Sequence, residues 1–452
     1  MPIDDGNDAR PFCTDPGLHI GVVMLYNVRA LHQVMQDIKL SRPQLDELIH
    51  QRLREVLISA YRHVPHYRES MKSVRYDPTK DYRGVEDLAW LPITTREDFK
   101  QKQSNHFMWE GYDISECFCE HSSGSTGIPL AVHRTPRERG LQIAKWLRVL
   151  FLNGYSVRDK VLSFSNALRF QNTKKHIGFI QRLGLLRRQA VDYTLPPAKL
   201  ADILLDSRPN VLYGNRSHLD LVALELKRRG ITAEGLKLVV GTGEVISDSS
   251  RSLFRETFGV ELLESYGSVE MGVMAYETPE HDGLHLCEDL TYFQFLDEEN
   301  NPVAPGEPGR VVVTDLTARL MPFIRYEHSD FVVFKEAENK EASPLRRLTK
   351  IVGRNEGFIS LCDGTKRSSL DLTSIVQSYS QIFQYQIIQV SHNLFQLLVV
   401  ADSAYLKSIH DQLLRKLNEK LLKLARFEIF QVDRIEPAAS GKTPRLILKA
   451  EK

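Results

Sequence analysis

The sequence predicts an α/β protein. A large N-terminal domain with parallel sheets and a β-rich subdomain is followed by a small α+β C-terminal domain. Three observations lead to this fold class. Strand-like and helix-like segments alternate over 161–265, short strands separated by turn residues follow over 283–334, and a second strand and helix pattern begins near residue 353. Alternation of this kind is typical of βαβ units, which build parallel sheets covered on both faces.

Two helix starts are marked by residues that cap helix N-termini. Apolar side chains recur every three or four positions over 41–61, and Ser41 followed by Gln44 has the pattern of a capping box. The pattern recurs at Thr135 and Glu138, with a proline between them. We therefore expect a long helix after each of these two caps.

The other elements follow from apolar runs and turn residues. Strands are expected at 117–121, 128–134, 161–164, 211–213, 236–240 and 260–265, and helices at 96–101, 197–207, 217–229 and 247–258. In the C-terminal part, strands are expected at 387–390, 397–400 and 427–432, and a helix at 402–424. About 100 residues are enough for a separate domain. We place the boundary near Arg354, which gives domains of 1–353 and 354–452.

Composition excludes several classes of protein. The 452 residues include 59 basic and 58 acidic side chains, a net charge of +1, whereas nucleic-acid binders usually carry a clear basic excess. No apolar stretch approaches the roughly 20 residues that cross a bilayer, and the N-terminus does not have the pattern of a signal peptide. Five cysteines make no disulfide framework in a chain of this length. A reducing cytoplasm is the expected compartment.

A loop of small residues lies between the first two expected strands. Glycines let backbone N–H groups converge on an anion, and hydroxyl groups add donors, so a phosphate is the natural ligand. The loop lacks the Gly-Lys-Ser/Thr ending of a Walker A motif and precedes a strand. A flexible hairpin turn is the alternative. The loop consists of Ser122, Ser123, Gly124, Ser125, Thr126 and Gly127.

Two further segments follow expected parallel strands, and ligands bind beyond the carboxyl ends of such strands. The first contains Gly241, Gly243 and Glu244, and the second contains Tyr266 and Glu270. Tyr266 offers a flat stacking face, and the carboxylate of Glu270 could hold a metal ion on a phosphate. The alternatives are an ordinary strand–helix turn and a strand end with a solvated glutamate.

Three later segments could complete a nucleotide site. Asp330 can accept two hydrogen bonds from a ribose diol. Arg354 lies at the expected domain junction, where flexible residues suit a hinge. Lys442 follows a glycine near the C-terminus and could swing into a site formed elsewhere. The alternatives are a surface ion-pair strand, a plain linker and a frayed basic tail.

The order of these segments resembles that of the adenylate-forming superfamily of acyl-CoA synthetases, peptide-synthetase adenylation domains and luciferases. Within it the chain looks most like the phenylacetate–CoA ligase branch, including its CapK-like members. The resemblance runs from about residue 45 to residue 445. It rests on six motifs in order: the small-residue loop, Gly243-Glu244, Tyr266-Gly267-Ser268-Val269-Glu270, Pro322-Phe323-Ile324-Arg325-Tyr326 with Asp330, Gly353-Arg354, and Gly441-Lys442.

The resemblance implies a two-step enzyme with a mobile C-terminal domain. A carboxylate attacks the α-phosphate of ATP to give acyl-AMP and pyrophosphate, and a thiol, expected to be that of coenzyme A, then takes the acyl group. ATP and Mg²⁺ are the implied cofactors, and coenzyme A is the co-substrate. The expected partner is a small carboxylic acid. A homodimer is left open, and neither nucleic acid nor a membrane span is expected.

The resemblance also assigns roles to residues. Lys442 would stabilise the reacting phosphorus and Glu270 would bind Mg²⁺, because phosphoryl transfer depends mostly on positioning and on neutralising charge. Asp330 would fix the ribose, with Arg354 near the same sugar. The loop 122–127 would hold phosphates. The remaining nucleotide-binding residues would be Gly243, Glu244, Ser265, Tyr266 and Gly267.

The acyl pocket is expected at the strand ends around 164–170, 213–215 and 241. Phe164, Phe170 and Tyr213 favour an aromatic or medium-sized apolar acid, whereas Asn215 leaves room for a polar substituent. Gly241 lies in the same region. Plain core packing is the alternative for the aromatic residues.

Two departures from the family pattern bear on activity. Ile128 stands where the phosphate loop often carries lysine, and Val269 stands where serine or threonine is common. Two other functions stay open, and these departures favour only the second of them. One is an adenylating enzyme that transfers the acyl group to an amine or sugar acceptor. The other is a catalytically weak relative that binds nucleotide.

Overall fold

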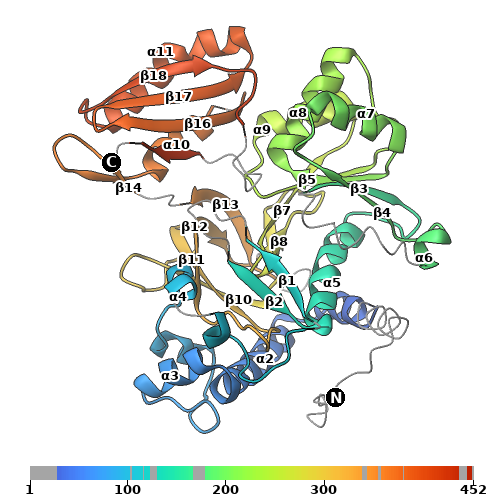
Figure 1. Ribbon diagram of the computed structural model, residues 1–452, viewed down its shortest axis with the longest axis vertical. Coiled ribbons are helices and arrows are strands. Elements are labelled where there is room, and N and C mark those ends of the chain that lie inside the picture. The colour runs from blue at the N-terminus through green and yellow to red at the C-terminus, as the bar shows by residue number, and fades with distance from the viewer. Residues whose placement is uncertain are drawn as a thin grey trace.

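The computed structural model describes residues 28–101, 104–115, 117–122, 130–165, 179–337, 344–354, 358–379, 381–436 and 445–449. Its centre is a mixed 11-stranded sheet, and a separate 4-stranded sheet with helices forms the C-terminal domain (Figure 1). The predicted α/β fold class is confirmed.

Helices make up most of the described N-terminal region. Leu45, Leu53 and Leu57 lie on the buried face of the first long helix and pack against Leu316 and Ile324. The backbone N–H of Ser41 donates to the side chain of Gln44 over 2.9 Å, which confirms the expected capping box. The elements are α2 (Arg42–His63), α3 (Pro65–Ser73), η1 (Val85–Trp90), α4 (Arg96–Gln101) and η2 (Ser104–Phe107).

A two-stranded hairpin and a long helix follow. β1 (Phe118–His121) pairs antiparallel with β2 (Ala131–Arg134). The second expected capping box is also confirmed. The backbone N–H of Glu138 donates to the Thr135 hydroxyl over 3.2 Å, and the backbone N–H of Thr135 donates to the Glu138 carboxylate over 2.8 Å. α5 (Pro136–Leu152) follows and contacts β8 of the large sheet.

The parallel half of the large sheet has the order β4-β3-β5-β6-β7. The elements expected between residues 161 and 265 are confirmed, with ends that differ by at most three residues. One parallel strand, β4, was not expected. The elements are β3 (Lys160–Ser165), α6 (Phe179–Arg182), β4 (Arg187–Asp192), α7 (Pro197–Ser207), β5 (Val211–Asn215), α8 (Arg216–Arg229), β6 (Leu238–Thr242), α9 (Asp248–Phe258) and β7 (Leu262–Ser268).

The antiparallel half continues the same sheet. After β7 the chain turns back into β8, and the order continues β7-β8-β9-β13-β12-β11-β10. The β-rich segment expected over 283–334 is therefore joined by hydrogen bonds to the parallel half. The strands are β8 (Gly272–Tyr276), β9 (Leu284–Leu286), β10 (Thr291–Leu296), β11 (Pro308–Asp315), β12 (Tyr326–Lys335) and β13 (Arg347–Arg354).

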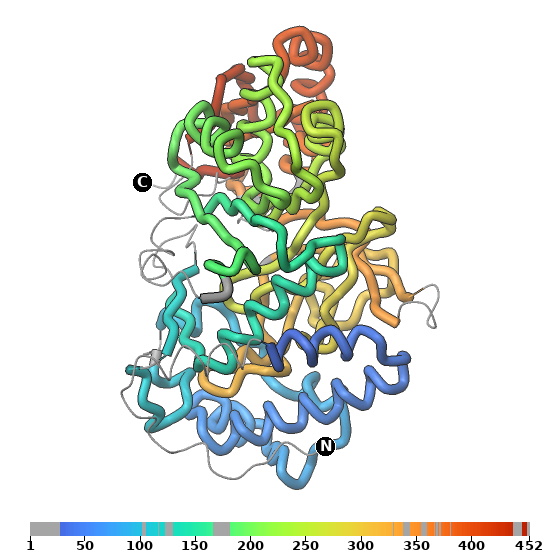
Figure 2. The backbone as a smooth tube through the Cα atoms, turned by 90° about the vertical axis from the view of Figure 1, so that its right-hand side faces the viewer, coloured from blue at the N-terminus to red at the C-terminus, as the bar shows by residue number. Residues whose placement is uncertain are grey.

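The C-terminal domain has its own apolar core, which includes Ile387, Leu397 and Leu413. Its sheet order is β18-β17-β16-β19, and the expected helix lies in it. Figures 1 and 2 place the domain beside α8 and α9, at the opposite end of the molecule from α2 and α3. The elements are β14 (Phe358–Ser360), β15 (Lys366–Ser368), α10 (Leu370–Gln377), β16 (Ile382–Ser391), β17 (Leu394–Ala401), α11 (Ser403–Lys420), β18 (Arg426–Gln431) and β19 (Leu446–Leu448).

Candidate functional site

The β1–β2 hairpin carries the expected phosphate loop. Ser122 is buried at the base of this loop, where its hydroxyl accepts hydrogen bonds from the backbone N–H of Leu130 over 2.9 Å and from the guanidinium of Arg96 over 2.7 Å. These contacts close the loop and bring a cation to its base. The other five loop residues lie outside the described residues: Ser123, Gly124, Ser125, Thr126 and Gly127.

Gly241 and Gly243 lie where β6 ends, and close packing explains both glycines. A Cβ on Gly241 would lie 3.0 Å from the side chain of Ile246. Gly243 has a φ of +77°, and a Cβ on it would lie 3.0 Å from Oδ1 of Asn215. The ends of β5 and β6 therefore approach each other closely, which places Asn215 next to the glycine turn.

Glu244 belongs to an ionic network. Its carboxylate accepts hydrogen bonds from Arg216 over 3.0 Å and from the hydroxyl of Ser217 over 2.6 Å. Burial alone would raise the pKa of Glu244, but Arg216, Ser217 and the more distant Arg445 outweigh it, and the pKa lies below its usual value. Glu244 is therefore ionised at neutral pH and holds the α8 N-terminus.

Tyr266 and Asp330 meet across the sheet. The Tyr266 hydroxyl donates to Oδ2 of Asp330 over 2.7 Å, and Nδ1 of His328 lies 2.7 Å from the same oxygen. All three side chains are buried. Two segments that lie 64 positions apart in sequence thus form one polar cluster. Ser265, the neighbour of Tyr266, pairs with Thr242 of β6, so the cluster also adjoins the glycine turn.

Glu270 lies in the tight turn between β7 and β8. Gly267 precedes the turn at a bulge, where a Cβ would lie 2.2 Å from the carbonyl oxygen of Gly272. The Glu270 side chain is buried, and no described residue donates a hydrogen bond to its carboxylate. A carboxylate with unused oxygens is the ligand type that Mg²⁺ prefers, so this residue fits the expected ion.

Some expected site residues are only partly described. Arg354 pairs with Asp330 in the backbone register of β12 and β13, which places the domain junction directly beside the Tyr266–Asp330 cluster. Phe170 and Lys442 lie outside the described residues, as does Ile128.

Two of the expected acyl-pocket aromatics, Phe164 and Tyr213, point to opposite faces of the sheet. Phe164 is 3% exposed and packs in the core under α7, α8 and α9. Tyr213 is the partner of Ser163 rather than of Phe164 in the β3–β5 register, so it points to the opposite face, where its ring lies 5.8 Å from that of Trp146. For Phe164, the structure therefore agrees with the alternative of core packing.

Three residues of the site were missed by sequence reasoning. Arg96 reaches the phosphate loop, His328 joins the Tyr266–Asp330 cluster, and Arg216 binds Glu244. His328 lies two positions from Asp330 and on the same face of its strand, which is a signal that could have identified it. Arg96 and Arg216 gave no comparable signal, because each reaches its partner across the fold.

Comparison with known proteins places this geometry in context. A family model of the CapK C-terminal domain matches residues 361–449. The chain is 28% identical to the phenylacetate-coenzyme A ligase of Pseudomonas putida over 321 residues, which are 68% of this chain and 70% of that protein. It is 27% identical to the phenylacetate-coenzyme A ligase of Escherichia coli (strain K12) over 334 residues, 70% of this chain and 72% of that protein.

Solved structures share the fold. The chain superposes on 2-hydroxyisobutyryl-CoA ligase in the postadenylation state, in complex with R3-HIB-AMP, with a TM-score of 0.73, 20% identity and coverage of 92% of this chain and 91% of that one. The TM-score is 0.62 for the same ligase in the thioesterification state, with 21% identity and 92% coverage of both chains. In the part of the chain that the structure describes, no helix has the length and apolar character needed to span a membrane. The chain is thus a homologue of the phenylacetate–CoA ligases, with the fold of the adenylate-forming acyl-CoA ligases and a CapK-type C-terminal domain.

Proposed function

We propose that this chain activates a carboxylic acid with ATP, releases pyrophosphate and transfers the acyl group from acyl-AMP to the thiol of coenzyme A. The observation that carries the proposal is the contact between Tyr266 and Asp330, because it unites two separate nucleotide motifs in one buried cluster. The similarity to phenylacetate–CoA ligases over about 70% of both chains supports the same reaction class.

In this proposal the described residues bind and orient ATP. Asp330 accepts hydrogen bonds from the ribose hydroxyls while Tyr266 and His328 fix its carboxylate. The loop that begins at Ser122 holds the phosphates. Mg²⁺, bound by Glu270, would neutralise phosphate charge. Gly243 and Tyr266 lie around the adenine.

Lys442 supplies the positive charge at the reacting phosphorus. Its ammonium would stabilise the charge that develops as the acid oxygen attacks, and electrostatic stabilisation of this kind is usually the largest single contribution to catalysis. Arg354 lies near the same sugar. We propose that the chain divides at this residue, with domains of 1–353 and 354–452, and that the smaller domain rotates between the two steps.

The substrate in this proposal is a small acid that fits beside Tyr213, Asn215 and Gly241. Phe170 remains a proposed contact, whereas Phe164 shapes the pocket only by supporting the strand beneath it. We also propose a cytoplasmic location, which suits thiols that form no disulfide bond among the described residues: Cys117, Cys119, Cys287 and Cys362. Size-exclusion chromatography with light scattering would test for the homodimer left open by the sequence.

A second candidate function differs only in the acceptor. Transfer of the acyl group from acyl-AMP to an amine or sugar, the alternative left open by the sequence, would use the same adenylation step. Mass spectrometry of the products, with and without coenzyme A, separates the two. An acyl-CoA thioester would support coenzyme A, and turnover that needs an amine or sugar would support the second candidate.

The proposal is tested by ATP–pyrophosphate exchange across a panel of aromatic and aliphatic acids. We expect exchange with at least one acid, and a loss of about 100-fold or more in Lys442→Ala. Lys449→Ala, an exposed lysine in the same tail, is the matched control and keeps wild-type exchange. If wild-type protein binds ATP but exchanges pyrophosphate with no acid, it is the weak nucleotide-binding relative instead.

A further inference from the structure

The turn that carries Glu270 has an unusual set of hydrogen bonds. Three successive backbone carbonyls, those of Val269, Glu270 and Met271, accept hydrogen bonds from buried cationic side chains. Turn carbonyls on a protein surface are usually satisfied by water. Here the cations come from β2 and α5, which are more than 120 positions away in sequence.

Arg134 is the first of these cations. It is 5% exposed, and one of its amino groups donates to the carbonyls of Val269 and Glu270 over 2.5 and 2.9 Å. The other amino group forms an ion pair of 2.8 Å with Glu120 of β1. Arg134 therefore ties the β1–β2 hairpin to the turn of Glu270.

Lys145 is the second cation. It is fully buried on α5, and its ammonium donates to the carbonyl of Met271 over 3.0 Å. Burial lowers the pKa of Lys145, and the nearby carboxylate of Asp315 offsets part of that effect. An ammonium with one carbonyl acceptor is costly in a protein interior, where an apolar side chain would be more stable. Fold stability alone does not explain a lysine here.

Close packing also fixes the turn. Gly272 has a φ of +70°, and a Cβ on it would lie 1.7 Å from the side-chain oxygen of Gln142 on α5. A cavity of about 10 Å³, the size of a single water, lies between Glu270, Arg134 and Asp315. The Glu270 backbone is therefore fixed on one side, and the residue lines a small cavity on the other.

We infer that Arg134 and Lys145 are positioning residues for Glu270. They hold its turn against the β1–β2 hairpin and α5, so that the Glu270 carboxylate would be fixed in place to hold Mg²⁺ for the phosphates of ATP. This inference rests on the proposed function, because it takes Glu270 as the metal ligand. Neither cation touches ATP. Each acts through the turn carbonyls.

The test measures binding of ATP by calorimetry, with Mg²⁺ and with EDTA, so that it needs no acid substrate. In Arg134→Gln and Lys145→Met we expect the affinity for ATP in Mg²⁺ to fall about tenfold, because residues that orient a metal ligand typically contribute 10–100-fold. Affinity in EDTA should stay at the wild-type value. Arg134→Lys, which keeps the charge and one donor, should recover part of the loss.

Arg139→Gln is the matched control. Arg139 also forms an ion pair with Glu120, over 2.9 Å, but donates to none of the three turn carbonyls. The Arg139→Gln variant should bind ATP with wild-type affinity both in Mg²⁺ and in EDTA. Near-ultraviolet circular dichroism identifies any variant that has lost its fold.

The outcomes separate this inference from the proposed function. Variants that lose affinity equally in Mg²⁺ and in EDTA, or in neither, would overturn the positioning role, as would wild-type binding that does not depend on Mg²⁺. Wild-type binding that depends on Mg²⁺ without pyrophosphate exchange on any acid would instead overturn the proposed reaction, and the variants would still report on Glu270.

Discussion

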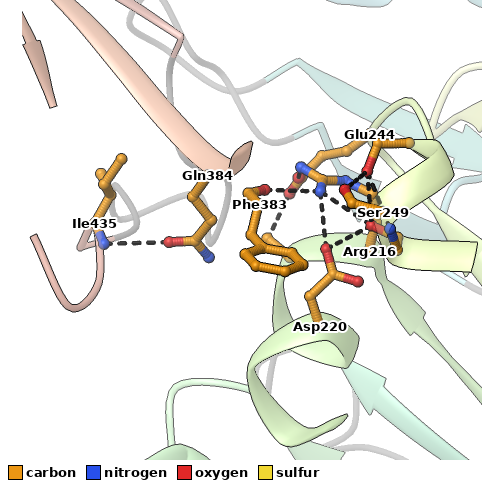
Figure 3. A network of polar contacts seen from close by, with 10 residues as sticks. Arg216, Asp220, Glu244, Ser249, Phe383, Gln384 and Ile435 are labelled. Atoms are coloured by element: carbon orange, nitrogen blue, oxygen red, sulfur yellow. Dashed lines mark hydrogen bonds and ion pairs between the residues drawn. The ribbon is translucent and has the colours of Figure 1, made fainter. Parts of the chain in front are cut away.

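The guanidinium of Arg216 donates a hydrogen bond of 2.8 Å to the backbone carbonyl of Phe383, and so joins α8 to the C-terminal sheet (Figure 3). The same guanidinium contacts Asp220 over 2.8 Å and Glu244 over 3.0 Å. The Phe383 ring packs against the apolar cluster under α7, α8 and α9. The interface between the domains therefore has an ionic half and an apolar half that meet at one residue.

Replacing Phe383 by serine should loosen the C-terminal domain without unfolding it. The change removes the apolar half of the interface and leaves the Arg216 network intact, whereas loss of Arg216 would leave the carboxylates of Asp220 and Glu244 without their cation. We expect a larger radius of gyration in small-angle X-ray scattering. Phe430→Ser is the control, because Phe430 lies exposed in the same sheet. Scattering identical to wild type would show that other contacts hold the domain.

Replacing Tyr266 by phenylalanine should weaken ATP binding about tenfold. The ring is kept, so stacking is unchanged, but Asp330 loses a hydrogen bond of 2.7 Å, and hydrogen bonds to charged groups contribute about 1.5–3 kcal/mol. Calorimetry measures the affinity. Tyr292→Phe, a partly buried tyrosine near α2, is the control. An affinity within twofold of wild type would mean that the Asp330 carboxylate is held without Tyr266.

The parts of the fold that could be predicted are those determined by local pattern. The capping boxes at Ser41 and Thr135 and the apolar strands of the parallel sheet needed only neighbouring residues. β4 was missed because an edge strand need not be apolar, and its sequence, RRQAVD, is mostly polar. β8 was missed because it begins four residues after β7 ends, and so short a connection shows no run of turn residues in the sequence.

The candidate site was predicted at the level of motifs and missed at the level of contacts. The motifs of Asp330 and Tyr266 are each expected to bind a nucleotide, but nothing in the sequence indicates that the two side chains touch. Lys145 resembles any polar residue of an amphipathic helix until the fold buries it. The sequence left two roles open for Phe164, because the face to which a strand residue points depends on register, and a shift of one residue reverses the face.

Replacing Gly267 by alanine should destabilise the turn of Glu270. A Cβ would lie 2.2 Å from the carbonyl oxygen of Gly272, and this oxygen belongs to the backbone and cannot rotate away. We expect a loss of about 2 kcal/mol in stability, seen as a lower melting temperature, and weaker binding of ATP in Mg²⁺. Gly306→Ala is the comparison variant, because at a φ of +91° it adds backbone strain while its Cβ meets no atom within 4 Å, so it separates strain from clash. Equal melting temperatures for the two variants would contradict the clash.

Glu264 gives the chain a pH-dependent stability that a single substitution should remove. Its carboxyl is buried beside Glu277, and burial, partly offset by Arg251, raises its pKa to about 7. In the unfolded chain a glutamate titrates near pH 4.3. The folded state therefore binds the proton more tightly, and its stability falls as pH rises from about 4 through 7.

Glu264→Gln stays neutral at every pH, so it should melt at the wild-type temperature at pH 4.5 and above it at pH 8. The difference between the folded and unfolded pKa of Glu264 corresponds to about 4 kcal/mol of stability at pH 8. Differential scanning fluorimetry at both pH values measures the difference in melting temperature between variant and wild type. Titratable groups that both proteins share affect both melting temperatures alike and drop out of this difference. Glu256→Gln, an exposed residue of α9 paired with Lys227, should show no gain at pH 8. A variant less stable than wild type at pH 8 would mean that Glu264 is ionised and paired in the fold.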